Sequence, residues 1–234
     1  MIPRFWSRGS TTLITVLSIL RPTPTSPFLL QVRASPRPFS STPSLAMSKK
    51  VLVPIADGSE EIETTCIQDT LVRFGASVTV ASVKPDGDLV CKMSRGIKFV
   101  ADTSIDEAVK EEWDLVALPG GMPGAEHLRD CQPLVDLLKK QMEAGKLYGA
   151  VCAAPAVVLA SHGLIAEGAS ATCYPAPAFR QMIAPFESND DVVVSDNLTT
   201  SQGPATAMDF ALQLGENLYG KEKRDEVAKA MLVK

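Results

Sequence analysis

Cys152 is the residue of this sequence whose surroundings best suit nucleophilic chemistry. It lies in the segment GAVCAAP (residues 149–155), after a short apolar run and before an apolar helical pattern. A cysteine at such a strand-to-helix turn has the layout of a nucleophile elbow, and small neighbours let other backbones approach it. A helix N-terminus favours the thiolate, which is the reactive form. The alternative is a small buried thiol without a chemical role, which is the usual state of a free cysteine.

A second segment, PGGMPG (residues 119–124), also follows an apolar run. It does not match G-x-G-x-x-G, and the sequence has no G-x-x-x-x-G-K, so it does not indicate a phosphate site. The N–H groups of Gly121 and Ala153 could instead hold an oxyanion together. A simple tight turn is the alternative for this segment.

Proton-transfer groups are few. Acidic residues crowd the start of a predicted helix in the segment EEIE (residues 60–63), where the helix dipole favours them, but the pattern does not say which acid faces inward. The two histidines, His127 and His162, fall in helical, surface-like contexts. The cysteines other than Cys152 are expected to be structural thiols, with Cys91 and Cys131 the more exposed. Neither C-x-x-C nor H-x-x-x-H occurs, so no metal site is indicated.

The elements that position these residues alternate along the chain. Short apolar runs predict buried strands over 51–55, 77–83, 114–118 and 147–151, with shorter strands over 192–194 and 198–200. Helical patterns cover about 60–74, 105–112, 134–144, 154–162, 204–218 and 222–232. Such alternation predicts one doubly wound α/β domain, with a mostly parallel sheet covered by helices on both faces. Sites of such sheets form at the carboxyl ends of the strands, where residues 56–60, 119–124 and 152–155 follow.

The first 46 residues differ in composition from the rest. They hold five Arg but no Asp, Glu or Lys, with many Ser, Thr and Pro. This composition is typical of an organelle transit peptide, and the segment 37–42 is similar to the end of a mitochondrial presequence. We therefore predict a cleaved leader over 1–46 and import into an organelle, a mitochondrion in preference to a plastid. Translation from Met47 for use in the cytosol, and secretion, stay open as alternatives.

The chain after this leader is acidic. It holds all 27 Asp and Glu but only 18 of the 23 Lys and Arg, because the other five lie in the leader, so its net charge is −9. A nucleic-acid-binding face needs clustered Lys and Arg, so we expect none. The apolar run 11–20 is far shorter than the roughly 20 residues of a membrane span. Five cysteines without a regular spacing do not indicate a secreted disulfide framework.

Five segments occur in an order that is specific in combination, although each is weak alone. They are DGSEEIE (57–63), SRG (94–96), DLVALPGG (114–121), AVCAAP (150–155) and TSQGPATA (200–207). Together they resemble the DJ-1/PfpI superfamily, and most closely its branch of DJ-1 (Parkinson disease protein seven) and YajL. The resemblance covers residues 48–234. It implies one domain with a flavodoxin-like, class I glutamine amidotransferase-like fold, assembled as a homodimer.

The resemblance also implies roles at the predicted turn. The nucleophilic, oxidation-sensitive cysteine of the family falls on Cys152, and the carboxylic acid that contacts its thiol falls on Glu63. The oxyanion-binding amides fall on Gly121 and Ala153. Protease-like members carry a histidine directly after the nucleophile, where this chain has Ala153, so proteolysis is not expected.

Three further positions follow from the resemblance. Arg95 falls on a position near the homodimer interface, and Pro204 on a pocket position close to that interface. Tyr174 stands where the family has a histidine near the cysteine. This departure removes imidazole as a base and leaves Glu63 as the main proton carrier.

The resemblance implies an enzyme of glyoxalase III or deglycase type that needs no metal or organic cofactor. Its substrates would be small dicarbonyls such as methylglyoxal and glyoxal, or early sugar adducts of proteins. The alternative is a redox-sensing, chaperone-like protein without useful turnover, in which Cys152 is oxidised to a sulfinate that Glu63 stabilises. The same two residues serve both functions, so the sequence does not separate them.

Overall fold

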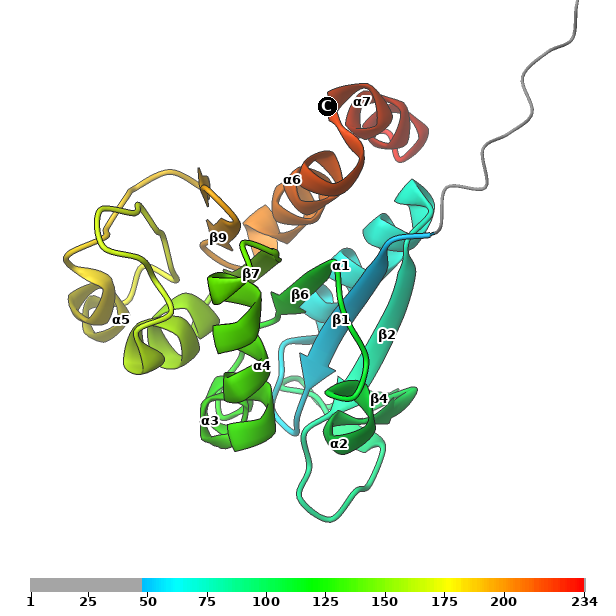
Figure 1. Ribbon diagram of the computed structural model, residues 1–234, viewed down its shortest axis with the longest axis vertical. Helices are drawn as coiled ribbons and strands as arrows, with labels where there is room; N and C mark the ends of the chain where they lie inside the picture. The colour runs from blue at the N-terminus through cyan, green and yellow to red at the C-terminus, as the bar shows by residue number, and fades with distance from the viewer. Residues whose placement is uncertain (1–47, 234) are drawn as a thin grey trace, which may run out of the picture. The chain divides into compact units, whose positions relative to one another are not determined.

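The computed structural model describes residues 48–233, and our predictions for residues 1–47 lie outside this range. Figure 1 shows the strands and helices in space. In chain order the elements are β1 (Lys50–Ile55), α1 (Glu61–Phe74), β2 (Ser77–Ser82), β3 (Val90–Lys92), β4 (Lys98–Val100), β5 (Thr103–Ser104), α2 (Ile105–Ala108), β6 (Leu115–Leu118), α3 (Gly124–Asp130), α4 (Gln132–Glu143), β7 (Leu147–Val151), η1 (Pro155–Leu159), η2 (Ala160–His162), α5 (Pro177–Ile183), β8 (Val192–Ser195), β9 (Leu198–Ser201), η3 (Pro204–Thr206), α6 (Ala207–Tyr219) and α7 (Lys221–Ala230).

Seven strands form one sheet in the order β5-β2-β1-β6-β7-β9-β8, and every pairing is parallel except β8 with β9. The central strands β6 and β9 are buried along their whole length, as a sheet covered on both faces requires. A separate two-stranded antiparallel hairpin pairs β3 with β4. The prediction of a doubly wound, mostly parallel sheet is therefore confirmed.

Alternate side chains of the strands point into two different hydrophobic cores. On β1, Leu52 belongs to the core that also holds residues of α2, α4 and η1, whereas Val51 and Val53 belong to the core that holds residues of α1 and α6. The two sets lie on opposite faces because strand side chains alternate. The helices thus cover both faces of the sheet (Figure 1).

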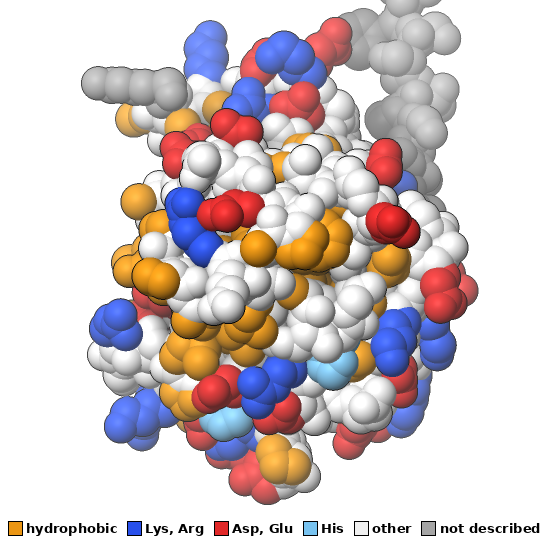
Figure 2. Space-filling model, turned by 90° about the vertical axis from the view of Figure 1, so that its left-hand side faces the viewer, with side chains coloured by type: hydrophobic (Ala, Val, Ile, Leu, Met, Phe, Trp, Pro, Cys, Tyr) orange, Lys and Arg blue, Asp and Glu red, His pale blue; other side chains and the backbone are white. Residues whose placement is uncertain are grey.

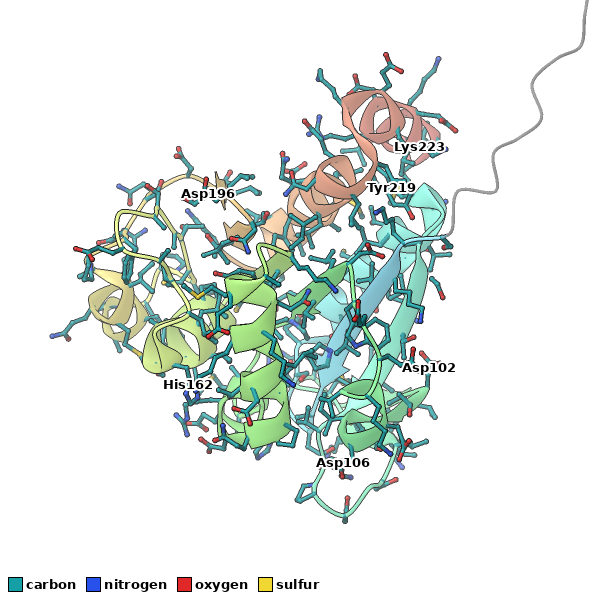
Figure 3. All side chains as sticks on the ribbon, viewed as in Figure 1. Asp102, Asp106, His162, Asp196, Tyr219 and Lys223 are labelled. Atoms are coloured by element: carbon teal, nitrogen blue, oxygen red, sulfur yellow. The ribbon has the colours of Figure 1, made fainter. Side chains whose placement is uncertain are left out.

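Helices α1 and α6 pack closely, and this contact fixes the helix that carries Glu63. The Phe74 ring lies where a Cβ on Gly215 would be placed, 2.2 Å from Phe74 Cε2, so only glycine fits there. The same ring stacks on Tyr219, labelled in Figure 3, with 5.9 Å between ring centroids. At the C-terminus of α1, Gly75 adopts a φ of 98° and donates to Leu71 and Val72, which ends the helix where the sequence predicted.

Some predicted elements differ in the structure. The helix predicted over 105–112 ends at Ala108, because Trp113 turns back into the core and donates its Nε1–H to Ala108 O at 3.0 Å. The helix predicted over 154–162 is a π-helical segment followed by a 3-10 turn. Ala160 N–H reaches Pro155 O there, five residues back. The sequence analysis did not predict β3, β4, β5, α3 or α5, each of which is seven residues or shorter.

Figure 2 shows the face on the side of α5. Hydrophobic side chains gather in patches near its centre, and acidic and basic side chains are intermixed around them. In the part of the chain that the structure describes, no helix has the length and apolar character needed to cross a bilayer.

Candidate active site

Cys152 lies directly after β7 with a φ of 64°, in the left-handed region that a non-glycine residue seldom adopts. Hydrogen bonds on both sides hold this conformation. Its N–H donates to Ser201 O at 3.0 Å, and its carbonyl accepts from Tyr174 N–H at 2.8 Å. Backbone strain of this kind is typical of functional sites. The nucleophile-elbow geometry predicted from GAVCAAP is present.

Gly120 fills the space beside this turn. A Cβ at this position would lie 2.7 Å from Cys152 Cβ and 2.8 Å from Val151 O, both closer than side chains approach. The loops after β6 and β7 therefore meet at a residue that must have no side chain. The sequence analysis named Gly121 in this segment and missed Gly120.

We expect Gly120→Ala to destabilise the fold by about 1–3 kcal/mol, because the added methyl group pushes the two loops apart. The measurement is the midpoint of urea unfolding. Gly203→Ala is the matched control: its Cβ would meet only the Tyr174 ring, at 3.4 Å, an ordinary contact distance. Equal midpoints for the two variants would contradict the close approach.

Glu63 lies in the first turn of α1 and is fully buried. Its Oε2 accepts a hydrogen bond from Gly120 N–H at 2.7 Å, and its carboxyl group lies close enough to the Cys152 thiol for each to shift the pKa of the other. Oε1 is buried and has no hydrogen-bond partner among residues 48–233. The structure thus selects Glu63 from the acids of the EEIE segment and places it against Cys152.

The two groups shift one another's ionisation. Burial raises the pKa of Glu63 to about 7, the Gly120 hydrogen bond and the nearby Cys152 thiol act in the opposite direction, and the charge of Glu60 adds to the rise. Burial also raises the pKa of Cys152 to about 12, and the Glu63 charge adds to it. The pair thus loses one proton near pH 7 and keeps the second far into the alkaline range.

Two backbone amides face the sulfur. The N–H groups of Gly121 and Ala153 lie close enough to the Cys152 thiol to lower its pKa, but burial and Glu63 outweigh them. The structure does bring Cys152, Glu63, Gly121 and Ala153 together, as the sequence analysis predicted.

The remaining predicted positions lie around this centre. Tyr174 contacts it through its backbone N–H, while its side chain is 45% exposed and its ring lies beside Gly203, next to Pro204. Arg95 is further removed: its N–H donates to Glu61 Oε1 at 2.8 Å, and its guanidinium group bonds Ser94 O at 3.3 Å.

The two histidines lie against backbone carbonyl oxygens, and Cys91 is buried in the core. His127 Nδ1 lies 3.0 Å from Asp57 O, and His162 Nε2 lies 2.9 Å from Arg129 O. Cys91 is fully buried, so the expectation that it is exposed is wrong: its strand β3 turns this side chain into the core beneath Ser82. Among residues 48–233, no group of three or more acidic, histidine or cysteine side chains is arranged to hold a metal ion.

A cavity of about 560 Å³ lies at the same edge of the sheet, between the loop after β2 and helices α2 and α3. Its lining includes Asp57, His127 and Asp106, the last of which is labelled in Figure 3, but neither Cys152 nor Glu63. The candidate active site is therefore the turn at Cys152 and not this cavity.

A strained cysteine on a strand-to-helix turn, in contact with a buried carboxyl group at the carboxyl edge of a doubly wound sheet, defines a class of α/β proteins with a cysteine centre. Within that class, the sequence model of the DJ-1/PfpI family matches residues 49–217. The chain belongs to this family.

Known relatives agree with this assignment. Protein dj-1beta of Drosophila melanogaster is 43% identical over 189 residues, covering 80% of this chain and 98% of that protein. A Caenorhabditis elegans relative, named glutathione-independent glyoxalase DJR-1.2, is 37% identical over 185 residues, 79% of this chain and 95% of its own length. The structure of oxidised Toxoplasma gondii DJ-1 superposes with a TM-score of 0.75 at 46% identity, covering 79% of this chain and 98% of that one.

Two Arabidopsis thaliana relatives are longer than this chain. DJ-1 homolog B is 42% identical over 216 residues, and the match covers 92% of this chain but 47% of homolog B. For DJ-1 homolog A the match covers 57% of the relative. The chain thus spans about half the length of these two proteins.

Proposed function

We propose that the protein is a cofactor-independent cysteine enzyme that converts small dicarbonyls, methylglyoxal or glyoxal, to 2-hydroxy acids. The observation that carries this proposal is the contact between the Cys152 thiol and the buried Glu63 carboxyl, whose raised pKa of about 7 lets it gain and lose a proton at neutral pH. A general acid–base group works best when its pKa lies near the working pH. The printed name of the Caenorhabditis elegans relative, a glutathione-independent glyoxalase, supports the same chemistry.

In the proposed reaction, the Cys152 thiolate adds to the aldehyde carbon of methylglyoxal, and the alkoxide formed takes a proton from the Glu63 carboxyl group to give a hemithioacetal. Glu63 removes the proton from that carbon and returns it to the adjacent one through an enediol. The result is a thioester of lactate, which water hydrolyses to lactate and the free thiol. The Gly121 and Ala153 amides stabilise the oxygen on which negative charge develops.

The test of this function is direct. The purified protein is incubated with methylglyoxal in the absence of glutathione, and lactate is followed by proton NMR against time. Steady formation of lactate over many turnovers is expected. Consumption that stops after one equivalent of methylglyoxal per Cys152 would show a trapped adduct instead and would overturn the proposal.

A redox-sensing, chaperone-like function is the second candidate. The groups that would stabilise an oxyanion, the two amides and a carboxyl group able to donate a hydrogen bond, also suit a sulfinate on Cys152. The related Toxoplasma gondii structure is of an oxidised protein. Quantitative sulfinate formation at Cys152 with about two equivalents of peroxide, one for each oxidation step, in a protein without lactate production, would favour this function over the first.

We also propose that the protein acts as a homodimer and is imported into an organelle, a mitochondrion in preference to a plastid, with loss of residues 1–46. The acid-free, arginine-containing composition of that leader supports import. N-terminal sequencing of the protein from cells tests it, because a mature protein that starts at Met1 would exclude cleavage. Light scattering of the mature protein measures the assembly, and a monomer mass would exclude the dimer.

A further inference from the structure

Glu60 and Glu63 are joined through Gly120 by a closed ring of three hydrogen bonds. Glu60 N–H donates to Gly120 O at 3.0 Å. Gly120 N–H donates to Glu63 Oε2 at 2.7 Å, and Glu63 N–H donates to Glu60 Oε2 at 2.9 Å. Each residue of the ring therefore both donates and accepts, and the position of the Glu63 carboxyl depends on the Glu60 side chain.

Glu60 is an unusual choice for this place. It is the N-cap of α1, a position that favours the shorter Ser, Thr, Asp and Asn. Its side chain is 5% exposed, and among residues 48–233 it forms no ion pair with Lys, Arg or His. A neutral cap would make the same hydrogen bond to Glu63 N–H without burying a charge. The charge is thus the property that a neutral residue would not supply in this place.

We propose that Glu60 is the positioning residue of the Cys152 site: the ring holds the Glu63 carboxyl against Gly120, and the Glu60 charge shifts the shared proton toward Glu63. A second negative charge beside Glu60 is costly in a buried place, so the Glu60 charge increases the fraction of the protein in which Glu63 keeps its proton and the sulfur carries the charge. The Gly121 and Ala153 amides, which face the sulfur, favour the same distribution. This role of Glu60 rests on the proposed function only for the turnover measurement described below.

Burial raises the pKa of Glu63 more than the Glu60 charge does, but Glu60 supplies the charge that acts on it. The groups that act on the ionisation of Glu63 are Gly120 N–H from the loop after β6, the Cys152 thiol from the turn after β7, and Glu60 from its own helix. Glu61 lies in the same helical turn, but its carboxylate accepts from Ser94 Oγ and Arg95 N–H, each at 2.8 Å, and so faces the opposite side. It provides a matched control.

The experiment measures the rate of Cys152 alkylation by iodoacetamide against pH in the full chain, with Glu60→Gln, Glu60→Asp and Glu61→Gln. In Glu60→Gln we expect the midpoint of the curve of alkylation rate against pH to fall by about 0.5–1 pH unit, because Glu63 then ionises more easily. Above this midpoint the alkylation rate should fall about three- to tenfold. The reason is that loss of the Glu60 charge stabilises the Glu63 carboxylate relative to the Cys152 thiolate by the same free energy that shifts the midpoint. Glu60→Asp keeps the charge and the cap and should retain the wild-type midpoint, as should Glu61→Gln.

An unchanged midpoint in Glu60→Gln would overturn the proposal, and so would an equal shift in Glu60→Asp or in Glu61→Gln. If circular dichroism shows that Glu60→Gln does not fold, Glu60→Ser replaces it: serine is a strong N-cap without charge, and the same downward shift is expected. Alkylation needs no dicarbonyl, so loss of lactate production in all proteins would count against the proposed function and not against the role of Glu60. With turnover present, Glu60→Gln should lower it and Glu60→Asp should restore it.

Discussion

Replacing Cys152 by serine is expected to lower lactate formation from methylglyoxal by on the order of a thousandfold or more, which is the scale for loss of a covalent nucleophile. A serine hydroxyl in this place has no strong base to remove its proton, because Glu63 is the only acid–base side chain that the structure places against residue 152 among those it describes. The corresponding covalent adduct, a hemiacetal, is therefore not expected to form at a useful rate. The measurement is the initial rate of lactate formation at saturating methylglyoxal.

Cys66→Ser is the matched control for this variant. Cys66 is a half-buried thiol on the same helix as Glu63, and burial raises its pKa as well. Its replacement should leave the rate within about twofold of wild type, since it touches none of the reacting atoms. A Cys152→Ser protein that kept near-normal turnover, or a Cys66→Ser protein that lost it, would assign the chemistry to another thiol.

The fold could be predicted from the sequence because its signals are local. Apolar runs mark β1, β6 and β7, and a glycine able to adopt positive φ marks the C-terminus of α1. The short elements were missed for the same reason: strands of three residues and helices of seven carry too few positions for a period to be detected. Their stability comes from packing on the sheet, which a local pattern does not contain.

Local sequence predicted the cysteine turn of the candidate site but did not predict which acid lies beside it. The turn at Cys152 is a contiguous segment, so small residues and a following proline indicate it. The choice of Glu63 among neighbouring acids depends on a hydrogen bond to Gly120, 57 residues away in the chain, which no local pattern shows. The resemblance to a known family supplied that residue before the structure did. The roles of Gly120 and Glu60 had no such source, because their hydrogen bonds to Glu63 and to one another appear only in the folded chain.

Glu63→Gln is expected to separate the two roles of the carboxyl group. The amide can still donate a hydrogen bond to sulfur but cannot carry a proton between the substrate carbons. Turnover of methylglyoxal should therefore fall roughly a hundredfold or more, the range for loss of a general acid–base group. Alkylation of Cys152 by iodoacetamide should persist at neutral pH, because that reaction needs no proton transfer by residue 63. Rate measurements of both reactions on the same preparation give the comparison.

The stability of this variant against pH provides an independent check, with a sign fixed by the direction of the shift. Folding raises the pKa of Glu63 from 4.5 to about 7, chiefly through burial. Between these values the unfolded chain has released the proton while the folded protein retains it, so the contribution of Glu63 to stability is present below pH 4.5 and is lost as pH rises to about 7. Glutamine does not titrate, so Glu63→Gln should gain stability relative to wild type across this range in urea unfolding. Near-normal turnover in Glu63→Gln would show that water or Tyr174 moves the proton, and a wild-type pH dependence of its stability would show that Glu63 is not the group that titrates.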